Sequence, residues 1–198
     1  RGARKPVYVD CNAVSPNTAQ RIGEVLAATG CAYVDAGIIG PPPAASSRTV
    51  IYASGAAAPK LERLNQLGLD LRVLDAPNGA ASALKMSYAG ITKGLTGLGS
   101  AMMLGATRSG ADAALRQELA ESQPQLLAWL ARQVPSMFPK AYRWVAEMEE
   151  IADFAAADSA ARQIYQGLAR LYERLATAAA EGERAQLSEF CKTAAAPR

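Results

Sequence analysis

A change of pattern near Pro77-Asn78-Gly79 is the feature that most constrains the fold of this chain. Before it, short runs rich in β-branched and aromatic residues alternate with helical segments, whereas after it apolar residues recur at helical spacing only. The first part predicts a strand, a helix, two strands, a helix and a strand, the order of one half of an α/β sheet. The predicted strands cover residues 6–10, 32–35, 49–52 and 71–74. We therefore expect an α/β domain over residues 1–78 and an all-helical domain over 79–198.

The longest predicted helix runs from Gly79 to Arg108 and carries glycines on one face. Gly90, Gly94 and Gly97 follow one another at spacings of four and three residues. Because a glycine inside a helix costs about 1 kcal/mol relative to alanine, glycines on one face favour close approach by a second helix. A loosely specified helix is the alternative interpretation.

Three further stripes of apolar residues predict helices in the second part of the chain. The first stripe, at 126–134, is expected to end at Pro135 and Pro139, since proline breaks the helical hydrogen-bond pattern. The second stripe covers residues 144–151, and a last long helix is expected after an N-cap at Ser159. Such stripes are typical of a helical bundle core and do not by themselves indicate a binding site.

The composition excludes several classes of chemistry. The chain has no histidine, so a Ser-His-Asp triad, a Cys-His pair and a His-ligated zinc ion are impossible. Three cysteines without C-x-x-C spacing argue against a disulfide framework and a metal site. The formal charge of +3 is spread along the chain, and no apolar run is long enough to cross a bilayer. We expect a soluble, cytoplasmic protein that binds neither nucleic acid nor membranes.

Three segments of the chain carry a family resemblance. They read D-C-N-A-V-S-P from Asp10, V-D-A-G-I-I-G from Val34 and G-A-A-S-A-L-K from Gly79. In this order they resemble the motifs D-x-S-T-x-S-P, F-V-D-A-P-V-S-G-G and G-x-G-x-x-x-K of the β-hydroxyacid dehydrogenase family, which includes 6-phosphogluconate and 3-hydroxyisobutyrate dehydrogenases. A fourth segment, W-V-A-E-M-E-E-I from Trp144, is similar to a subgroup described only as phosphogluconate-dehydrogenase-like.

The resemblance implies the C-terminal half of a Rossmann-type NAD(P)-binding domain, with about four strands, followed by a helical dimerisation domain that opens with a long interdomain helix. It also implies that about ninety residues with a G-x-G-x-x-G phosphate loop precede Arg1, since that motif does not occur in this sequence. The implied partners are a second copy of the chain and a small hydroxy or oxo acid. The implied cofactor is NAD or NADP, and the residues that would choose between them lie outside this sequence.

The substrate-loop motifs depart from the family pattern. Asn12-Ala13 stand where the family has Ser-Thr, and Ile39-Gly40-Pro41 stand where it has Ser-Gly-Gly. The resemblance implies that Asn12, Ala13, Ile39 and Gly40 line the substrate site. We expect a substrate other than the family's usual small 3-hydroxy acid.

Two departures follow on the helical side. The family's asparagine four positions after the lysine is Ala89 here, with Tyr88 beside it. A lysine that the family places near the nicotinamide corresponds to Glu149. The resemblance therefore implies that Tyr88 contacts the substrate and that Asn12 and Glu149 lie near the cofactor.

Lys85 is the candidate for the chemical step. Hydride transfer between an alcohol and a ketone needs a group that takes and returns the hydroxyl proton. Since the chain has no histidine, a lysine in the first turns of a helix that faces an α/β sheet is the best candidate. Burial and the positive end of the helix dipole should lower the pKa of its amine toward neutrality. The alternative is a surface lysine that extends its charge into water.

The neighbouring polar residues each have a structural interpretation as well. Asn12 could bind a substrate carboxylate or hydroxyl, or it could cap the turn after the strand. Tyr88 lies on the same helix face as the lysine and could hydrogen-bond the substrate, or it could be an aromatic core residue. The Gly40 turn could present backbone N–H groups to an anion. Asp10 and Asp35, at the strand ends, are expected to cap backbone groups and hold loop shape.

Two other functions are compatible with the sequence. Imine reductases resemble this architecture and often lack the lysine, so Lys85 counts against that class. The chain could also be a non-catalytic dimerisation module whose active site has been lost through the changes at Ala89 and Glu149. The predicted function is that of an NAD(P)-dependent dehydrogenase or reductase of hydroxy or oxo acids.

Overall fold

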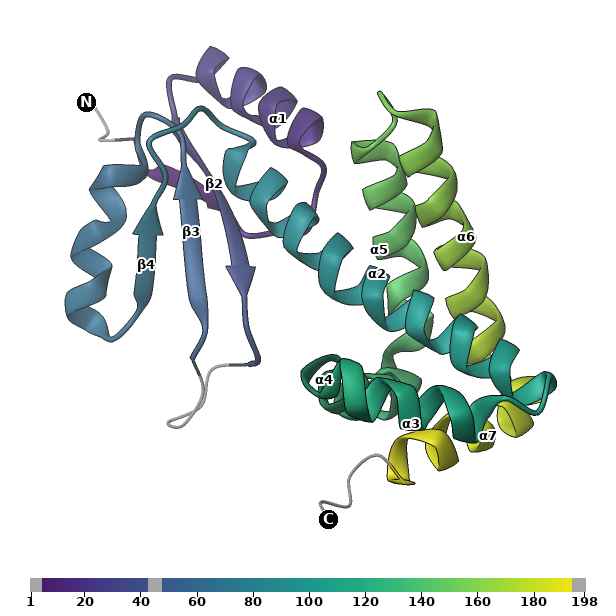
Figure 1. Ribbon diagram of the computed structural model, residues 1–198. Coiled ribbons are helices and arrows are strands. Elements are labelled where there is room, and N and C mark those ends of the chain that lie inside the picture. The colour runs from purple at the N-terminus through teal and green to yellow at the C-terminus, as the bar shows by residue number, and fades with distance from the viewer. Residues whose placement is uncertain (1–4, 43–47, 194–198) are drawn as a thin grey trace. The chain divides into compact units, whose positions relative to one another are not determined.

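The computed structural model describes residues 5–42 and 48–193. The chain divides into two compact units, Arg1–Tyr88 and Ala89–Arg198. The first holds a four-stranded mixed sheet, and the second consists of helices (Figure 1). This order confirms the predicted α/β fold followed by an all-helical part. The predicted domain boundary at residue 78 stays a prediction, because helix α2 (Ala80–Arg108) begins in the first unit and continues into the second.

The sheet of the first unit consists of β1 (Val7–Asp10), β2 (Ala32–Ile39), β3 (Val50–Ser54) and β4 (Asp70–Val73). Its strand order is β1-β2-β3-β4, with β1 parallel to β2, β2 antiparallel to β3, and β3 parallel to β4. The register pairs Asp10 with Asp35 and Asp35 with Ser54. These three polar residues therefore form a row across the sheet, which we call the polar row. β2 is longer than predicted, because pairing with β3 extends it as far as Ile39.

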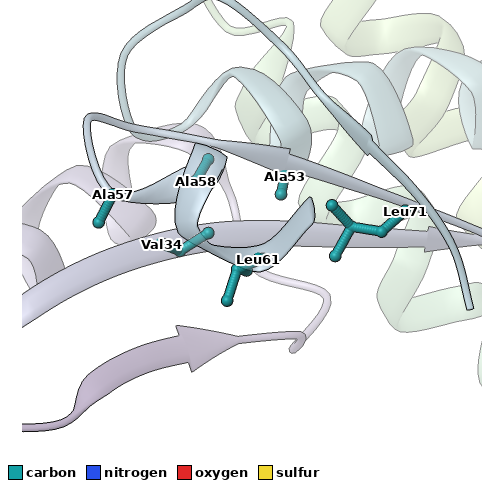
Figure 2. Packing of buried hydrophobic residues seen from close by; sticks show 6 residues of the cluster. All are labelled: Val34, Ala53, Ala57, Ala58, Leu61 and Leu71. Carbon is teal, nitrogen blue, oxygen red and sulfur yellow. The ribbon is translucent and has the colours of Figure 1, made fainter. Parts of the chain in front are cut away.

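One face of the sheet is covered by η1 (Ala58–Leu67), a 3₁₀ helix. Val34 and Ala53, from neighbouring strands, pack against Ala58 and Leu61 of η1, and Leu71 of β4 completes the buried cluster (Figure 2). This cluster is the hydrophobic core on that side of the sheet. Because successive residues of a strand point to opposite faces, the polar row points away from this core.

Helix α1 (Pro16–Ala28) lies on the face that carries the polar row. Ser15 caps it by accepting a hydrogen bond from the amide of Thr18 at 3.3 Å, and Pro16 follows in the first turn, where a missing N–H costs no helical hydrogen bond. The helix approaches β2 closely at Gly23, where an ideal Cβ would lie 3.1 Å from Cδ1 of Tyr33. Tyr33 precedes a core residue of β2, so its ring is on the face opposite η1.

The second unit holds the rest of α2 together with α3 (Asp112–Ser122), α4 (Pro124–Met137), η2 (Phe138–Lys140), α5 (Ala141–Phe154), α6 (Ser159–Ala176), η3 (Ala178–Ala180) and α7 (Glu181–Thr193). Helices α5 and α6 pack along each other, and α4 packs on α3 and α7 (Figure 1). Trp144 of α5 meets Tyr172 of α6 edge-on, with ring centroids 5.2 Å apart. In the described part of the chain, every helix is too short or too polar to span a bilayer.

The glycine face of α2 receives α6, which confirms the close approach predicted from the spacing. An ideal Cβ at Gly90 would lie 2.9 Å from the hydroxyl oxygen of Tyr165. One at Gly97 would lie 2.6 Å from Cδ2 of Leu168, whereas one at Gly94 would make ordinary contacts at 3.7 Å or more. A side chain at the first or third glycine would therefore displace part of α6.

Two predicted helix boundaries are wrong. Helix α4 does not end at Pro135 but continues to Met137, because Val134 and Met137 are fully buried and carry the apolar stripe past the proline. This burial outweighs the hydrogen bond that the proline removes. The N-cap of α6 is Asp158 rather than Ser159, since the Asp158 carboxylate accepts hydrogen bonds from two first-turn amides at 2.9 and 3.2 Å.

Helices α3 and α7 have no counterpart in the sequence prediction. Helix α3 contains no buried residue, so it lacks the apolar stripe by which an amphipathic helix is recognised. Helix α7 buries Leu187, Phe190 and Cys191 within a single turn, which is too short a pattern to show a helical period.

Candidate functional site

Four hydrogen bonds to Asp35 fix the beginning of α2 on the sheet. The amides of Gly79 and Ser82 each donate to Oδ2 of Asp35 at 3.0 Å. The hydroxyl of Ser82 donates to Oδ1 at 2.6 Å, and the hydroxyl of Ser54 donates to Oδ2 at 3.1 Å. Gly79 adopts a φ of +98°, a conformation that favours glycine, where the chain turns into the helix. Asp35 thus acts as an N-terminal cap for α2, supplied from another element.

Lys85 stands one turn beyond Ser82, directly over β2. An ideal Cβ on Gly37 would lie 2.8 Å from the carbonyl oxygen of Ala81 and 3.3 Å from Cβ of Lys85. The absence of a side chain at Gly37 is therefore what lets α2 rest on the strand. No ion pair or hydrogen bond of the Lys85 amine occurs within the described residues. Burial lowers the pKa of this amine, and the charges of Cys11 and Asp35 oppose the effect without reversing it.

Cys11 follows β1 and lies close enough to Lys85 for the two charges to interact. The pairing of β1 with β2 places the residues after Asp10 beside Ala36 and Gly37, the part of β2 over which the lysine stands. Burial raises the pKa of the Cys11 thiol, and so do the carboxylates of Asp10 and Asp35, while Lys85 lowers it. The net shift is upward, so this thiol is a weak nucleophile at neutral pH.

Asp10 holds the loop that contains Asn12. The backbone N–H of Asn12 donates to Oδ1 of Asp10 at 3.0 Å, and its side-chain amide donates to the same oxygen at 2.7 Å. On the other side, the Tyr33 hydroxyl donates to Oδ2 at 3.5 Å, and burial together with Asp10 raises the pKa of that hydroxyl. Asn12 therefore stabilises the turn after the strand, which is its structural interpretation, and its side chain stays exposed.

The other predicted substrate-loop residues lie after β1 and at the end of β2. Ala13 is exposed and directly follows Asn12. Ile39 ends β2 and is paired with Val50, about 7 Å along the strand from Gly37. Gly40 lies in the turn that leaves β2, with a φ of +129° and its ideal Cβ 2.6 Å from a carbonyl oxygen of the returning chain. Gly40 is thus required by the hairpin itself.

The two helical candidates belong to different units. Tyr88, at the end of the first unit, is 52% exposed one turn beyond Lys85. It is therefore a surface residue, and not the aromatic core residue of the structural interpretation. Glu149 is exposed on α5 in the second unit.

The lysine is surrounded by residues that the sequence did not single out. Gly37 was overlooked, although a lone glycine inside a predicted buried strand is a known sign of close backbone approach. For Cys11 the sequence indicates only that a disulfide framework and a metal site are absent. Residues 5–42 and 48–193 contain no cluster of three or more Cys, Asp or Glu that could hold a metal ion.

Two grooves of the first unit lie away from Lys85. One, of about 650 Å³, lies between the loop after β3 and the loop after β4, and includes Gly55, Asp75 and Pro77. The other, of about 430 Å³, is mainly apolar and lies between Tyr8 of the edge strand β1 and Val25 of α1. None of the predicted site residues lines either groove.

Comparison with known proteins supports the fold and finds one family model that matches part of the helical unit. Residues 106–175 match the model of DUF1932, a domain of unknown function. The solved structure of MTH1747, a conserved protein of unknown function described as structurally similar to 3-hydroxyacid dehydrogenases, matches with a TM-score of 0.75 at 26% identity over 91% of this chain and 67% of its own. A conserved hypothetical protein from Sinorhizobium meliloti matches with a TM-score of 0.72 at 22% identity over 93% of this chain and 66% of its own.

The chain spans about two thirds of the length of these two solved structures. None of the curated proteins is similar enough in sequence to match it. The order of sheet and helices agrees with these matches. The chain has the fold that MTH1747 shares with 3-hydroxyacid dehydrogenases, and its residues 106–175 are similar to the DUF1932 family.

Proposed function

We propose that this chain is part of an NAD(P)-dependent oxidoreductase that transfers hydride between a nicotinamide and a hydroxy or oxo acid, with Lys85 as general acid and base. The observation that carries the proposal is a partly buried amine, free of protein partners in the described residues, on a helix end that Asp35 anchors to the sheet. A group in that setting can exchange a proton with a ligand hydroxyl. Similarity of MTH1747 to 3-hydroxyacid dehydrogenases supports the same class of reaction.

The protonation of Lys85 sets the direction in which it works. Oxidation of an alcohol needs the neutral amine, so its rate should fall as the pH drops below the pKa of Lys85. Reduction of a ketone needs the ammonium group, so its rate should fall as the pH rises above the same pKa. Because burial lowers this pKa, both changes should occur at lower pH than for an exposed lysine.

The residues of this chain do not fit a whole dinucleotide. The sequence contains no G-x-G-x-x-G loop to hold the pyrophosphate. Asn12, a candidate for the cofactor side, already donates its amide to Asp10. We place the phosphate contacts in the part of the related structures that this chain does not span, and the nicotinamide would supply or accept the hydride. Lys85 would then transfer only the proton of the substrate hydroxyl.

The test is the full-length protein with NADH or NADPH and a panel of 2-oxo and 3-oxo acids. Lys85→Met should lower turnover of an accepted substrate by about a hundredfold or more, as expected for loss of a general acid/base. Lys60→Met, which removes an exposed lysine of η1, is the matched control and should leave turnover unchanged. A Lys85→Met enzyme within a few-fold of wild type would refute the role of the lysine. Turnover of cyclic imines but of no oxo acid would favour imine reduction instead.

We also propose that α2 mediates a homodimer. Along the second unit, this helix exposes a face about 100° around its axis from the one that packs on α6, with side chains that are 43% to 65% exposed. These are Ile91, Leu95, Leu98 and Met102. Their spacing of four, three and four residues is that of a coiled-coil seam, which is self-complementary between two copies.

The charge pattern of α2 supports burial of this face. Between Met86 and Thr107 the only charged residue is Lys93, which forms an ion pair with Glu147 and lies 5.1 Å from the ring centre of Trp144 within the same unit. A helix that is apolar on all sides is normally buried. Contiguous exposed apolar patches of a few hundred Å² often mark protein interfaces.

Light scattering on the full-length protein tests the dimer. Wild type should have twice the mass of one chain, and Leu98→Glu should shift it to the monomer at micromolar concentration. Ile164→Glu, a control on an exposed apolar residue of α6, should remain dimeric. A monomeric wild type, or a dimeric Leu98→Glu variant, would exclude this interface.

A further inference from the structure

We infer that Asp35 is a positioning residue for Lys85, because its carboxylate anchors the first turn of α2 to β2 and its charge acts on the amine one turn further along the helix. The inference rests on the proposed function in one respect only, the role of the Lys85 amine as an acid and base. The placement and the charge effect can be measured without turnover.

The anchoring follows from the directions of the hydrogen bonds. Two backbone amides and two hydroxyls converge on one carboxylate that is 1% exposed. Backbone N–H groups can only donate, so Asp35 is held as an acceptor at the position where α2 begins. Ser54 reinforces the arrangement, because its Oγ also accepts a hydrogen bond from the amide of Ala81 at 3.1 Å. Sheet and helix are therefore joined through side chains on both β2 and β3.

The position of Lys85 follows from this joint. Lys85 lies three residues after Ser82 and so emerges on the same face of α2. That face touches β2 at Gly37, two residues beyond Asp35 and on the same side of the strand. A shift of the first turn would move the amine along the strand by a similar amount. The length and flexibility of a lysine side chain do not remove this dependence, because its Cβ is held against Gly37.

The charged groups that face Lys85 from the neighbouring elements are few. Burial lowers the pKa of the amine, while Cys11 after β1 and then Asp35 on β2 raise it by less. Asp10 faces the thiol of Cys11 and the hydroxyl of Tyr33. Asp35 is thus a buried carboxylate whose charge favours the protonated form of the lysine. An amine used for both oxidation and reduction needs both forms within reach.

Asp35→Asn removes the negative charge of the side chain and keeps its shape. An asparagine oxygen in place of Oδ2 can accept the bonds from Gly79, Ser82 and Ser54, and its amide can donate to the Ser82 hydroxyl in place of Oδ1. The variant therefore loses the charge and keeps the four contacts, with the Ser82 hydroxyl accepting the bond that it donates in the wild type. Asp35→Glu retains the charge, and Ser54→Ala removes one hydrogen bond and retains the charge.

The experiment is competitive acetylation of the full-length protein across a pH series, with the labelling of each lysine read by peptide mass spectrometry. Lys60, which is exposed, serves as the internal reference. The labelling midpoint of Lys85 should move to lower pH in Asp35→Asn, because removing a nearby negative charge favours the neutral amine. The midpoint should stay at the wild-type value in Ser54→Ala and return toward it in Asp35→Glu.

An Asp35→Asn midpoint equal to that of wild type would overturn the inference, and so would equal shifts in Asp35→Asn and Asp35→Glu. Circular dichroism of each variant shows whether the helices are retained. Failure of the proposed function gives a different result, since Lys85→Met would then retain turnover whatever the labelling shows.

Discussion

Replacing Gly97 by alanine should destabilise the helical unit, although the same replacement in an open helix position is stabilising. The new Cβ would lie 2.6 Å from Cδ2 of Leu168 and 3.0 Å from the hydroxyl oxygen of Tyr172. Leu168 is 4% exposed and Tyr172 is fully buried, with its hydroxyl donating to the carbonyl oxygen of Lys93. Neither neighbour can move away without disturbing other contacts.

The magnitude is the balance of two terms. Alanine gains up to about 1 kcal/mol over glycine inside a helix. Forcing a methyl group into a packed site costs about 1–3 kcal/mol. The end of the Leu168 side chain is flexible and can shift in part. Because Tyr172 is held by its hydrogen bond, we place the cost of the new methyl group in the upper part of that range. The expected net loss for Gly97→Ala is about 1–2 kcal/mol.

Gly105→Ala is the matched control, because it lies on the same helix and its Cβ would meet nothing within 4 Å. It should stabilise the protein by about 0.5–1 kcal/mol. The two variants should therefore differ by about 1.5–3 kcal/mol. With a urea dependence of about 2 kcal/mol per molar, that difference separates their unfolding midpoints by about 0.8–1.5 M.

Urea unfolding of the full-length variants, followed by circular dichroism at a helical wavelength, measures these midpoints. Gly94→Ala, whose Cβ would make contacts of 3.7 Å or more, should behave like the control. If Gly97→Ala is as stable as Gly105→Ala, the close approach of α6 to α2 is wrong, and so is the packing of the second unit.

Three further predictions concern single contacts. Lys85→Met should raise the pKa of Cys11 and slow its alkylation by iodoacetamide at pH 8, because the lysine charge favours the thiolate. An unchanged or faster alkylation rate, measured on the Cys11 peptide, would contradict the proximity of the two residues. Asp158→Ala should cost about 1 kcal/mol in urea unfolding through loss of the α6 cap, and Asp158→Asn should restore most of it. Gly37→Ala should cost about 1–3 kcal/mol, because the new Cβ would lie 2.8 Å from a backbone carbonyl of α2; a neutral effect would mean that the helix does not rest on the strand.

The sequence determined the fold class and most of the elements. Alternating short apolar runs and capped helices predicted the strand and helix order of the first unit, because these signals are local. The glycine spacing on α2 predicted a close helical neighbour for the same reason. The spacing did not indicate which helix would approach α2. The pairing with α6 depends on contacts between residues more than seventy positions apart in the chain.

The errors occurred where tertiary packing outweighs local preference. Pro135 is tolerated inside α4 because buried side chains follow it. β2 extends beyond its predicted end because β3 pairs with it. Helix α3 buries nothing, so its sequence carried no periodic signal.

For the site, the sequence by itself determined only the candidate: with no histidine, a lysine in the first turns of the helix after the sheet was the remaining strong base. The tertiary structure decided its surroundings. Asp35 receives the amides of residues 44 and 47 positions away, and Gly37 makes room for the helix that carries Lys85. Hydrogen bonding and burial between segments this distant depend on the folded arrangement of the strands, and neither propensity nor spacing along the chain encodes them.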